Sequence, residues 1–194
     1  MNVAEFLDNP LCVTGDRPAL ISGIGASRRE LSYRELPNRV DSLVRALCDR
    51  GLRPGDRVLL AVPVSIETYV AMLAILKAGM VVMFIDPAHS AAGVARSLRA
   101  HPPAGVVGSR PILLLRHLLP QLRRIPIRMT PFATAVDRAA AVVAVDRSSE
   151  DSALLTFTSG STGDPKPVVR THGFLRNQLD MLDRVAEPEA ADID

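Results

Sequence analysis

The chain has 194 residues, of which 47% are hydrophobic and 23% are charged. This composition is that of a globular protein long enough to bury one sizeable core. The 23 basic and 21 acidic residues give a formal net charge of +2, and the arginines are scattered rather than interleaved with aromatic residues in a run. Nucleic acid is therefore not an expected partner.

Cysteine usage and the N-terminus indicate a reducing compartment. Cys12 and Cys48 lie far apart and form no CxxC motif or Cys/His cluster that could hold a metal ion. Residues 1–8 carry acidic side chains where a signal peptide carries basic ones. The longest apolar stretch is interrupted by Lys77 and Gly79, so no membrane span is expected. We expect a cytoplasmic protein.

The first long helix is predicted from apolar residues that recur at helical spacing between positions 36 and 47. Ser32 and Glu35 form a capping box in front of it. Because Pro37 has no amide to offer the preceding turn, regular helix is expected to begin there and to end at Gly51.

Further along the chain, short apolar runs bounded by turn residues predict strands, and longer periodic segments predict helices. The expected strands are residues 58–62, 81–85, 105–107, 142–145, 154–158 and 168–171, and the expected helices are residues 66–78, 91–100, 112–122 and 173–185. Pro120, Pro126 and Pro131 indicate loops in the middle of the chain. Strands that alternate with helices of this length imply βαβ crossovers, so the predicted fold class is α/β, with a mostly parallel sheet covered by helices on both faces.

A segment rich in glycine and hydroxyl side chains joins the last two expected strands. It consists of Thr158, Ser159, Gly160, Ser161, Thr162, Gly163, Asp164, Pro165 and Lys166. Glycines let backbone amides approach phosphate oxygens, hydroxyls add donors, and Lys166 supplies a positive charge for the β- and γ-phosphates of ATP. A plain surface turn is the alternative, but the full string ending in Pro-Lys favours phosphate binding.

An unrelated P-loop NTPase is a less favoured interpretation of this segment. The Walker motif has a Lys-Ser/Thr pair that opens a helix, whereas here Asp164, Pro165 and Lys166 lead into a strand.

The same string resembles the signature loop of the acyl-adenylate-forming, or AMP-binding, superfamily, which holds acyl-CoA synthetases, peptide-synthetase adenylation domains and luciferases. Three upstream segments resemble that family in the same order: residues 31–36 (Leu-Ser-Tyr-Arg-Glu-Leu), 55–58 (Gly-Asp-Arg-Val) and 76–87. The resemblance covers about residues 16–185, nearly the whole chain.

This resemblance implies a two-step ligase. A carboxylate, with a fatty acid as the expected substrate, attacks the α-phosphorus of ATP, pyrophosphate leaves, and a thiol then attacks the acyl-adenylate. The implied cofactors are ATP and Mg²⁺, with CoA as the acceptor. His172 is a candidate on the substrate side, with a structural hydrogen-bonding role as the alternative. The expected ATP-phosphate site consists of Thr158, Ser159, Gly160, Ser161, Thr162, Gly163 and Lys166. No catalytic residue is assigned.

The sequence also departs from the family pattern. Pro167 follows the loop lysine where the family usually has glycine, and Phe84 stands where a small residue or proline is common. The family's adenine, ribose and lid motifs are not found after Lys166. Residues 1–194 are therefore expected to be the N-terminal portion of an adenylation domain without its C-terminal lid. We expect an exposed sheet edge and apolar face, and a complementary C-terminal fragment as a partner.

Two alternative functions stay open. Residues 84–87 and 169–172 also resemble the olefin β-lactone synthetase branch of the superfamily. A non-catalytic remnant, or a nucleotide-binding module that kept the loop without the chemistry, is the second alternative.

Overall fold

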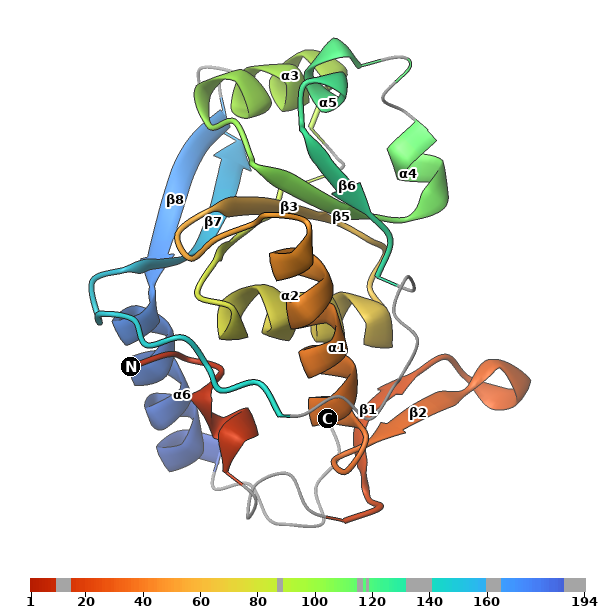
Figure 1. Ribbon diagram of the computed structural model, residues 1–194, viewed down its shortest axis with the longest axis vertical. Coiled ribbons are helices and arrows are strands. Elements are labelled where there is room, and N and C mark those ends of the chain that lie inside the picture. Colours follow the sequence, from red (N-terminus) through yellow and green to blue (C-terminus); the bar gives the residue numbers. More distant parts are fainter. Residues whose placement is uncertain are drawn as a thin grey trace.

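Six strands form one mixed sheet at the centre of the molecule (Figure 1). The computed structural model describes residues 1–9, 15–86, 89–114, 117, 119–131, 141–159 and 165–186. The strand order is β6–β5–β3–β4–β7–β8, and every neighbouring pair is parallel except β7 and β8, which run antiparallel. The strands are β3 (Arg57–Ala61), β4 (Val81–Met83), β5 (Gly105–Gly108), β6 (Ile127–Met129), β7 (Ser152–Ser159) and β8 (Pro165–Thr171).

Helices cover both faces of this sheet, which confirms the predicted α/β fold. The helices are α1 (Leu36–Asp49), α2 (Ile66–Lys77), α3 (Ala91–Ala100), α4 (Arg110–Leu114), α5 (Pro120–Arg123) and α6 (His172–Ala186). Because successive residues of a strand point to opposite faces, Val58 and Leu60 of β3 pack with α1 and α2, whereas Leu59 packs with α3 and α5. Each face therefore has its own apolar core.

Helix α1 begins directly after the predicted capping box. The Ser32 N–H and hydroxyl donate to Glu35 Oε2 at 3.1 and 2.8 Å, and the Glu35 N–H donates to Ser32 Oγ at 3.3 Å. The Glu35 carboxylate accepts two of these hydrogen bonds, from the Ser32 N–H and from the Ser32 hydroxyl. The first of them, and then the second, hold the pKa of Glu35 below its usual value. The reciprocal contacts form as expected, and the helix itself starts at Leu36, next to Pro37. Gly51 and Gly79, with φ of +90° and +71°, follow α1 and α2 where helix ends were predicted.

Three predicted segments were wrong. Residues 142–145 form no strand; their amides bond to side chains and to a helix end instead. The single helix over residues 112–122 is divided, because α4 ends at Leu114 and a separate helix, α5, begins at Pro120 after the extended residue Leu119. Residues 127–129, expected in a loop region, form the edge strand β6.

A small antiparallel hairpin lies outside the main sheet and has no counterpart in the sequence predictions. It consists of β1 (Pro18–Ser22) and β2 (Arg29–Ser32). Every residue of β1 is half-buried, so the strand lacks the alternation of buried and exposed residues that marks a strand in a sequence.

Lys77, the last residue of α2, joins the N-terminal segment to the core through an ion pair with Asp8. Lys77 is 1% exposed, and its Nζ lies 2.7 Å from Asp41 Oδ1 and 2.9 Å from Asp8 Oδ1. The same two carboxylates accept hydrogen bonds from the Val142 and Ala144 amides at 3.1 and 2.8 Å. The segment leading into β7 is thus fixed by charges from three distant parts of the chain.

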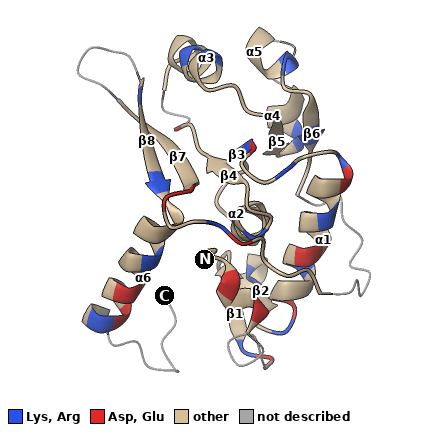
Figure 2. Ribbon diagram, turned by 60° about the vertical axis from the view of Figure 1, so that its left-hand side comes forward, with Lys and Arg blue, Asp and Glu red and all other residues tan. Residues whose placement is uncertain are grey.

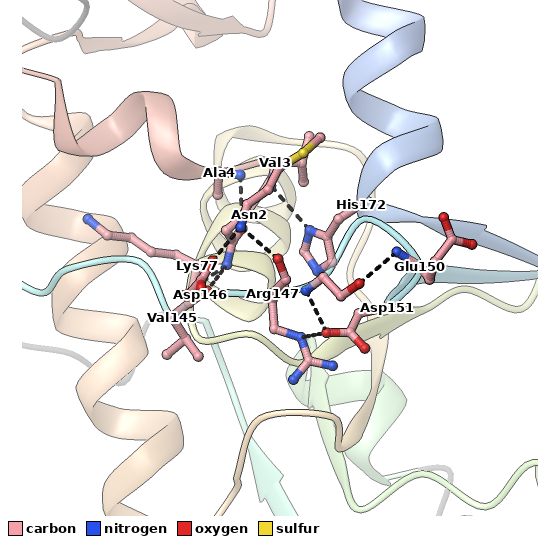
Figure 3. A network of polar contacts seen from close by, with 12 residues as sticks. Asn2, Val3, Ala4, Lys77, Val145, Asp146, Arg147, Glu150, Asp151 and His172 are labelled. Carbon is pink, nitrogen blue, oxygen red and sulfur yellow. Dashed lines mark hydrogen bonds and ion pairs between the residues drawn. The ribbon is translucent and has the colours of Figure 1, made fainter.

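Asn2 extends this anchoring (Figure 3). Its Nδ2 donates to the Leu76 carbonyl at 2.7 Å and to the Val145 carbonyl at 2.9 Å, bridging α2 and the segment before β7. Asn2 is itself 2% exposed, so these bonds form in a site shielded from water.

Charged residues of both signs are scattered over most of the surface (Figure 2). Among the residues that the structure describes, no helix is both long enough and apolar enough to cross a lipid bilayer.

Candidate functional site

The β7–β8 pair carries the predicted phosphate loop. Ser159 pairs with Pro165 at the open end of the pair, and Thr158 lies directly opposite Lys166. The Thr158 and Lys166 side chains are both exposed. The predicted residues Gly160, Ser161, Thr162 and Gly163 lie outside the described part of the chain. The prediction that the loop joins two strands is confirmed, because β7 ends at Ser159 and β8 begins at Pro165.

The loop leaves the sheet at the edge where ligands of open α/β sheets bind. β7 is parallel to β4, and β4 to β3, so the end of β7 at Ser159 lies on the same edge as the carboxyl ends of these strands. The first turn of α3 lies beside the start of β8. Gly93 is so close to Pro165 that a side-chain Cβ at position 93 would be 3.6 Å from Pro165 Cγ. The Gly93 N–H donates to Ser90 Oγ at 3.1 Å, which caps this helix.

The direction of the β8 backbone explains how Pro167 is tolerated. The Phe84 N–H donates to the Leu155 carbonyl at 2.9 Å. The backbone N–H and C=O of Leu155, and those of Phe157 two residues on, therefore face β4. The N–H and C=O groups of successive residues point to opposite sides of a strand, so those of Thr156 and Thr158 face β8.

The partners of these two threonines, Val168 and Lys166, therefore face β7, whereas Pro165 and Pro167 face the free edge of the sheet. The missing N–H of Pro167 consequently removes no bond from the ladder.

Below the loop, one side-chain contact joins the two strands and another packs β7 against the end of α3. Arg170 Nη1 donates to Thr156 Oγ1 at 3.0 Å across the two strands. The Phe157 ring, 7% exposed, lies 5.7 Å from the His101 ring at an angle of 59°, which packs the end of β7 against α3. These residues were not singled out from the sequence. Period-two alternation along residues 154–170 is the signal that would have placed Thr156 and Arg170 together.

His172, the predicted substrate-side residue, lies at the opposite end of β8 from the loop. Seven strand residues separate the two, which is about 20 Å at the usual rise per residue. The structure therefore does not bring His172 and the phosphate loop together.

The His172 side chain is fully buried beneath the N-terminal segment (Figure 3). Its Nδ1 accepts a hydrogen bond from the Val3 N–H at 3.2 Å, so the proton of the neutral ring is on Nε2. Nε2 is buried and has no hydrogen-bond partner in the described part of the chain. Burial, and then the positive charge of Arg147, lower the pKa of His172 below its ordinary value, against the opposing effect of Asp151.

No metal site is evident among the described residues: they contain no group of three or more His, Cys, Asp or Glu side chains that could hold an ion.

Comparison with known proteins places this site in a family. The profile of the AMP-binding enzyme family matches residues 11–192. A phosphinothricin tripeptide synthetase of Streptomyces viridochromogenes is 36% identical over 173 residues, which are 86% of this chain and 14% of that protein. An olefin β-lactone synthetase of Stenotrophomonas maltophilia is 32% identical over 195 residues, covering 89% of this chain and 34% of that protein.

Solved structures share the fold. A fatty acyl-adenylate ligase from L. pneumophila, solved in complex with acyl adenylate and pyrophosphate, matches with a TM-score of 0.81 at 21% identity, over 97% of this chain and 33% of that one. The chain thus spans about a third or less of the length of these relatives. Because the family profile extends over nearly the whole sequence, the chain belongs to the AMP-binding enzyme family.

Proposed function

We propose that the loop between β7 and β8 binds the β- and γ-phosphates of ATP, and that the chain serves in the activation of a carboxylic acid as an acyl-adenylate. One observation carries the proposal. The strand pair presents the signature segment at the carboxyl edge of the sheet, with the exposed Lys166 and Thr158 facing each other at its base.

These residues suit a polyphosphate. Lys166 supplies a positive charge and the Thr158 hydroxyl a donor. Their strands are joined by the Arg170–Thr156 hydrogen bond, and β7 packs on the end of α3 through Phe157. Ser159, Gly160, Ser161, Thr162 and Gly163 would complete the cradle with further hydroxyl and amide donors. The role of this site is to position the nucleotide and to stabilise the negative charge of the departing pyrophosphate. Mg²⁺ would accompany the nucleotide phosphates.

The substrate and the acceptor are finer parts of the proposal. A fatty acid, with CoA as the thiol acceptor, is the first candidate. An olefin β-lactone synthetase activity is the second, and it is favoured by the identity of 32% to such an enzyme from Stenotrophomonas maltophilia. The cytoplasm is the proposed location, on the ground of the cysteine pattern.

We further propose that residues 1–194 act as the N-terminal portion of an adenylation domain. Activity would then require a polypeptide equivalent to the rest of the relatives' length, in the same or in a second chain. A nucleotide-binding module without ligase chemistry is the alternative.

ATP–pyrophosphate exchange with a panel of carboxylic acids tests the proposal. We expect no exchange from residues 1–194 alone and acid-dependent exchange once the rest of an adenylation domain is supplied, with loss of that exchange in Lys166→Ala. Exchange by the isolated chain would contradict the requirement for a further polypeptide. Exchange unaffected by Lys166→Ala would contradict the assignment of the loop.

A further inference from the structure

Positive charge is concentrated in one stretch of the chain. Residues 87–136 contain seven of the 23 basic residues, all of them arginine, and none of the 21 acidic residues. The rest of the chain therefore carries more acidic than basic side chains, although the formal net charge of the whole chain is +2. A stretch of this length without a carboxylate to balance its arginines indicates an anionic partner.

The fold gathers this stretch at one end of the molecule. The stretch forms α3, β5, α4, α5 and β6, of which β5 and β6 are the last two strands at one edge of the sheet. Helices α3 and α5 pack together over one sheet face, through Leu98, Leu122 and Ile125. Figure 1 shows both helices at the opposite end of the molecule from α6, and Figure 2 shows basic and no acidic residues on them. We call these five elements the cationic lobe.

Four arginines of the cationic lobe are free to contact an outside partner. They are exposed, and within the described part of the chain their side chains make no ion pair or hydrogen bond: Arg99, Arg110, Arg123 and Arg124. Arg128 is different, because its Nη1 donates to the Arg123 carbonyl at 3.3 Å. Elsewhere in the chain exposed arginines find carboxylates, as Arg28 does with Glu30 at 2.6 Å. The four guanidinium groups of the lobe have no internal carboxylate to neutralise them.

Two of these arginines flank a cleft between α3 and the end of α5. The cleft has a volume of about 270 Å³, and its lining includes Arg99, Arg124 and the amide side chain of Gln121. Its apolar floor includes Leu98 and Ile125, which are 4% and 3% exposed. None of the described residues that line it is acidic. Two guanidinium groups and an amide donor suit a phosphate group, and the apolar floor suits the hydrocarbon next to a lipid phosphate.

A lipid surface fits the cationic lobe better than a nucleic acid does. Sites for RNA and for single strands combine arginines with aromatic side chains that stack on bases, and residues 87–136 contain one aromatic residue, Phe132. The lobe instead presents an aliphatic side chain, Leu114, which is 62% exposed at the end of α4. The cytoplasmic leaflet of a membrane is anionic and attracts arginines near its surface. It also repels the net acidic remainder of the chain, so the lobe is the part turned toward the membrane.

We propose that the cationic lobe binds the surface of an anionic phospholipid membrane, with a lipid phosphate held in the cleft between Arg99 and Arg124. This association goes beyond the proposed function and does not need a nucleotide at the β7–β8 loop. It places the chain beside the bilayer, into which fatty acids, the first candidate substrates, partition. Each exposed arginine near an anionic surface strengthens binding by about fivefold, and added salt screens this attraction.

Sedimentation with lipid vesicles tests the proposal. The purified chain is mixed, without nucleotide, with vesicles of phosphatidylcholine alone or of phosphatidylcholine and phosphatidylglycerol in equal parts. We expect binding to the anionic vesicles only, and release as the salt concentration is raised. Arg99→Gln and Arg124→Gln should each weaken binding by about fivefold. Arg184→Gln, which removes an exposed charge from α6, is the matched control and should weaken binding by less than about twofold.

Four results would overturn the proposal. The first is equal binding to both kinds of vesicle, and the second is a loss in Arg99→Gln and Arg124→Gln no larger than in Arg184→Gln. The third is release of the chain by inorganic phosphate but not by chloride of equal ionic strength, which would make the cleft a site for a free anion. The fourth is tighter binding to a single-stranded RNA than to the anionic vesicles, which would assign the lobe to nucleic acid.

Folding and the proposed function are kept apart from this test. Because Arg99, Arg124 and Arg184 are all exposed, the three variants should unfold at the same urea concentration as the parent chain, so that a loss of binding is not a loss of folding. The vesicle assay contains no nucleotide, so its failure would leave the assignment of the phosphate loop standing.

Discussion

Lys77 and Asp41 form an ion pair inside the core, with 2.7 Å between Nζ and Oδ1. Both side chains are at least 95% buried, and Asp41 also accepts the Val142 amide. Lys77 lies in residues 76–87, one of the three upstream segments that resemble the family, and its environment is structural: it joins α1, α2, the N-terminal segment and the entry to β7.

Lys77→Met should lower the free energy of unfolding by about 3–5 kcal/mol, because it leaves the Asp41 carboxylate buried without its counter-ion. Denaturant unfolding of the purified chain measures the change. Lys166→Met is the matched control, since Lys166 is the chain's other lysine and is exposed. It should alter stability by less than about 0.5 kcal/mol. Equal effects of the two substitutions would mean that Lys77 is not buried in a charge network.

Acidification should destabilise the protein through His172. The pKa of His172 is lowered in the folded state from its ordinary value of 6.5, so the unfolded chain takes up this proton first. The stabilising contribution is therefore complete above pH 6.5 and is lost as the pH falls from there toward the folded-state pKa. The slope contributed by one proton is at most about 1.4 kcal/mol per pH unit.

His172→Gln should remove this part of the pH dependence below pH 6.5 while leaving the acid unfolding caused by carboxylates. Urea unfolding of both proteins across this range measures the difference. The protection factor of the Val3 amide, which bonds to His172 Nδ1, should fall on acidification of the native protein once exchange is corrected for its intrinsic pH dependence. Parallel stability curves for the two proteins would show that His172 does not titrate in this range.

The orientation of β8 predicts opposite outcomes for proline at two adjacent positions. Val168 faces β7, so Val168→Pro removes a ladder hydrogen bond, leaves the carbonyl opposite it without a donor, and should cost about 1–3 kcal/mol. Val169 faces the free edge, so Val169→Pro should be tolerated with a much smaller loss, as Pro165 and Pro167 are. Unfolding free energies of the two variants provide the test, and equal losses would contradict the assigned hydrogen-bonding direction.

The regular elements could be predicted from sequence because their signals are local. Helix α3 has the predicted bounds, and the strands on both sides of the phosphate loop were expected from short apolar runs. The segment at 142–145 was misread as a strand because it has the same apolar, β-branched composition. Its amides are satisfied by Asp8 and Asp41, carboxylates more than 100 residues away, and no local pattern indicates such partners.

For the candidate site, the sequence predicted the strands that flank the loop, and the phosphate-binding role of its residues stays a prediction. Thr158, Ser159 and Lys166 could be named from the motif, and their strand context followed from the flanking residues. The burial of His172 could not, since it depends on Val3, which is 169 positions away in the chain. The effect of Pro167 on the strand ladder could not be predicted either, because only the position of β8 at the sheet edge shows that its missing donor is not needed.

The central claim, that the β7–β8 loop holds the β- and γ-phosphates of ATP, is tested most directly by the chemical reactivity of Lys166. The chain's two lysines differ in burial, so mild acetylation followed by peptide mass spectrometry reads Lys166 at the site and Lys77 as an internal control for folding. ATP with Mg²⁺, and inorganic pyrophosphate, should slow acetylation of Lys166 severalfold, whereas AMP should not, and Lys77 should stay unmodified throughout. An acetylation rate of Lys166 that saturating ATP leaves unchanged, while Lys77 stays protected, would contradict the claim.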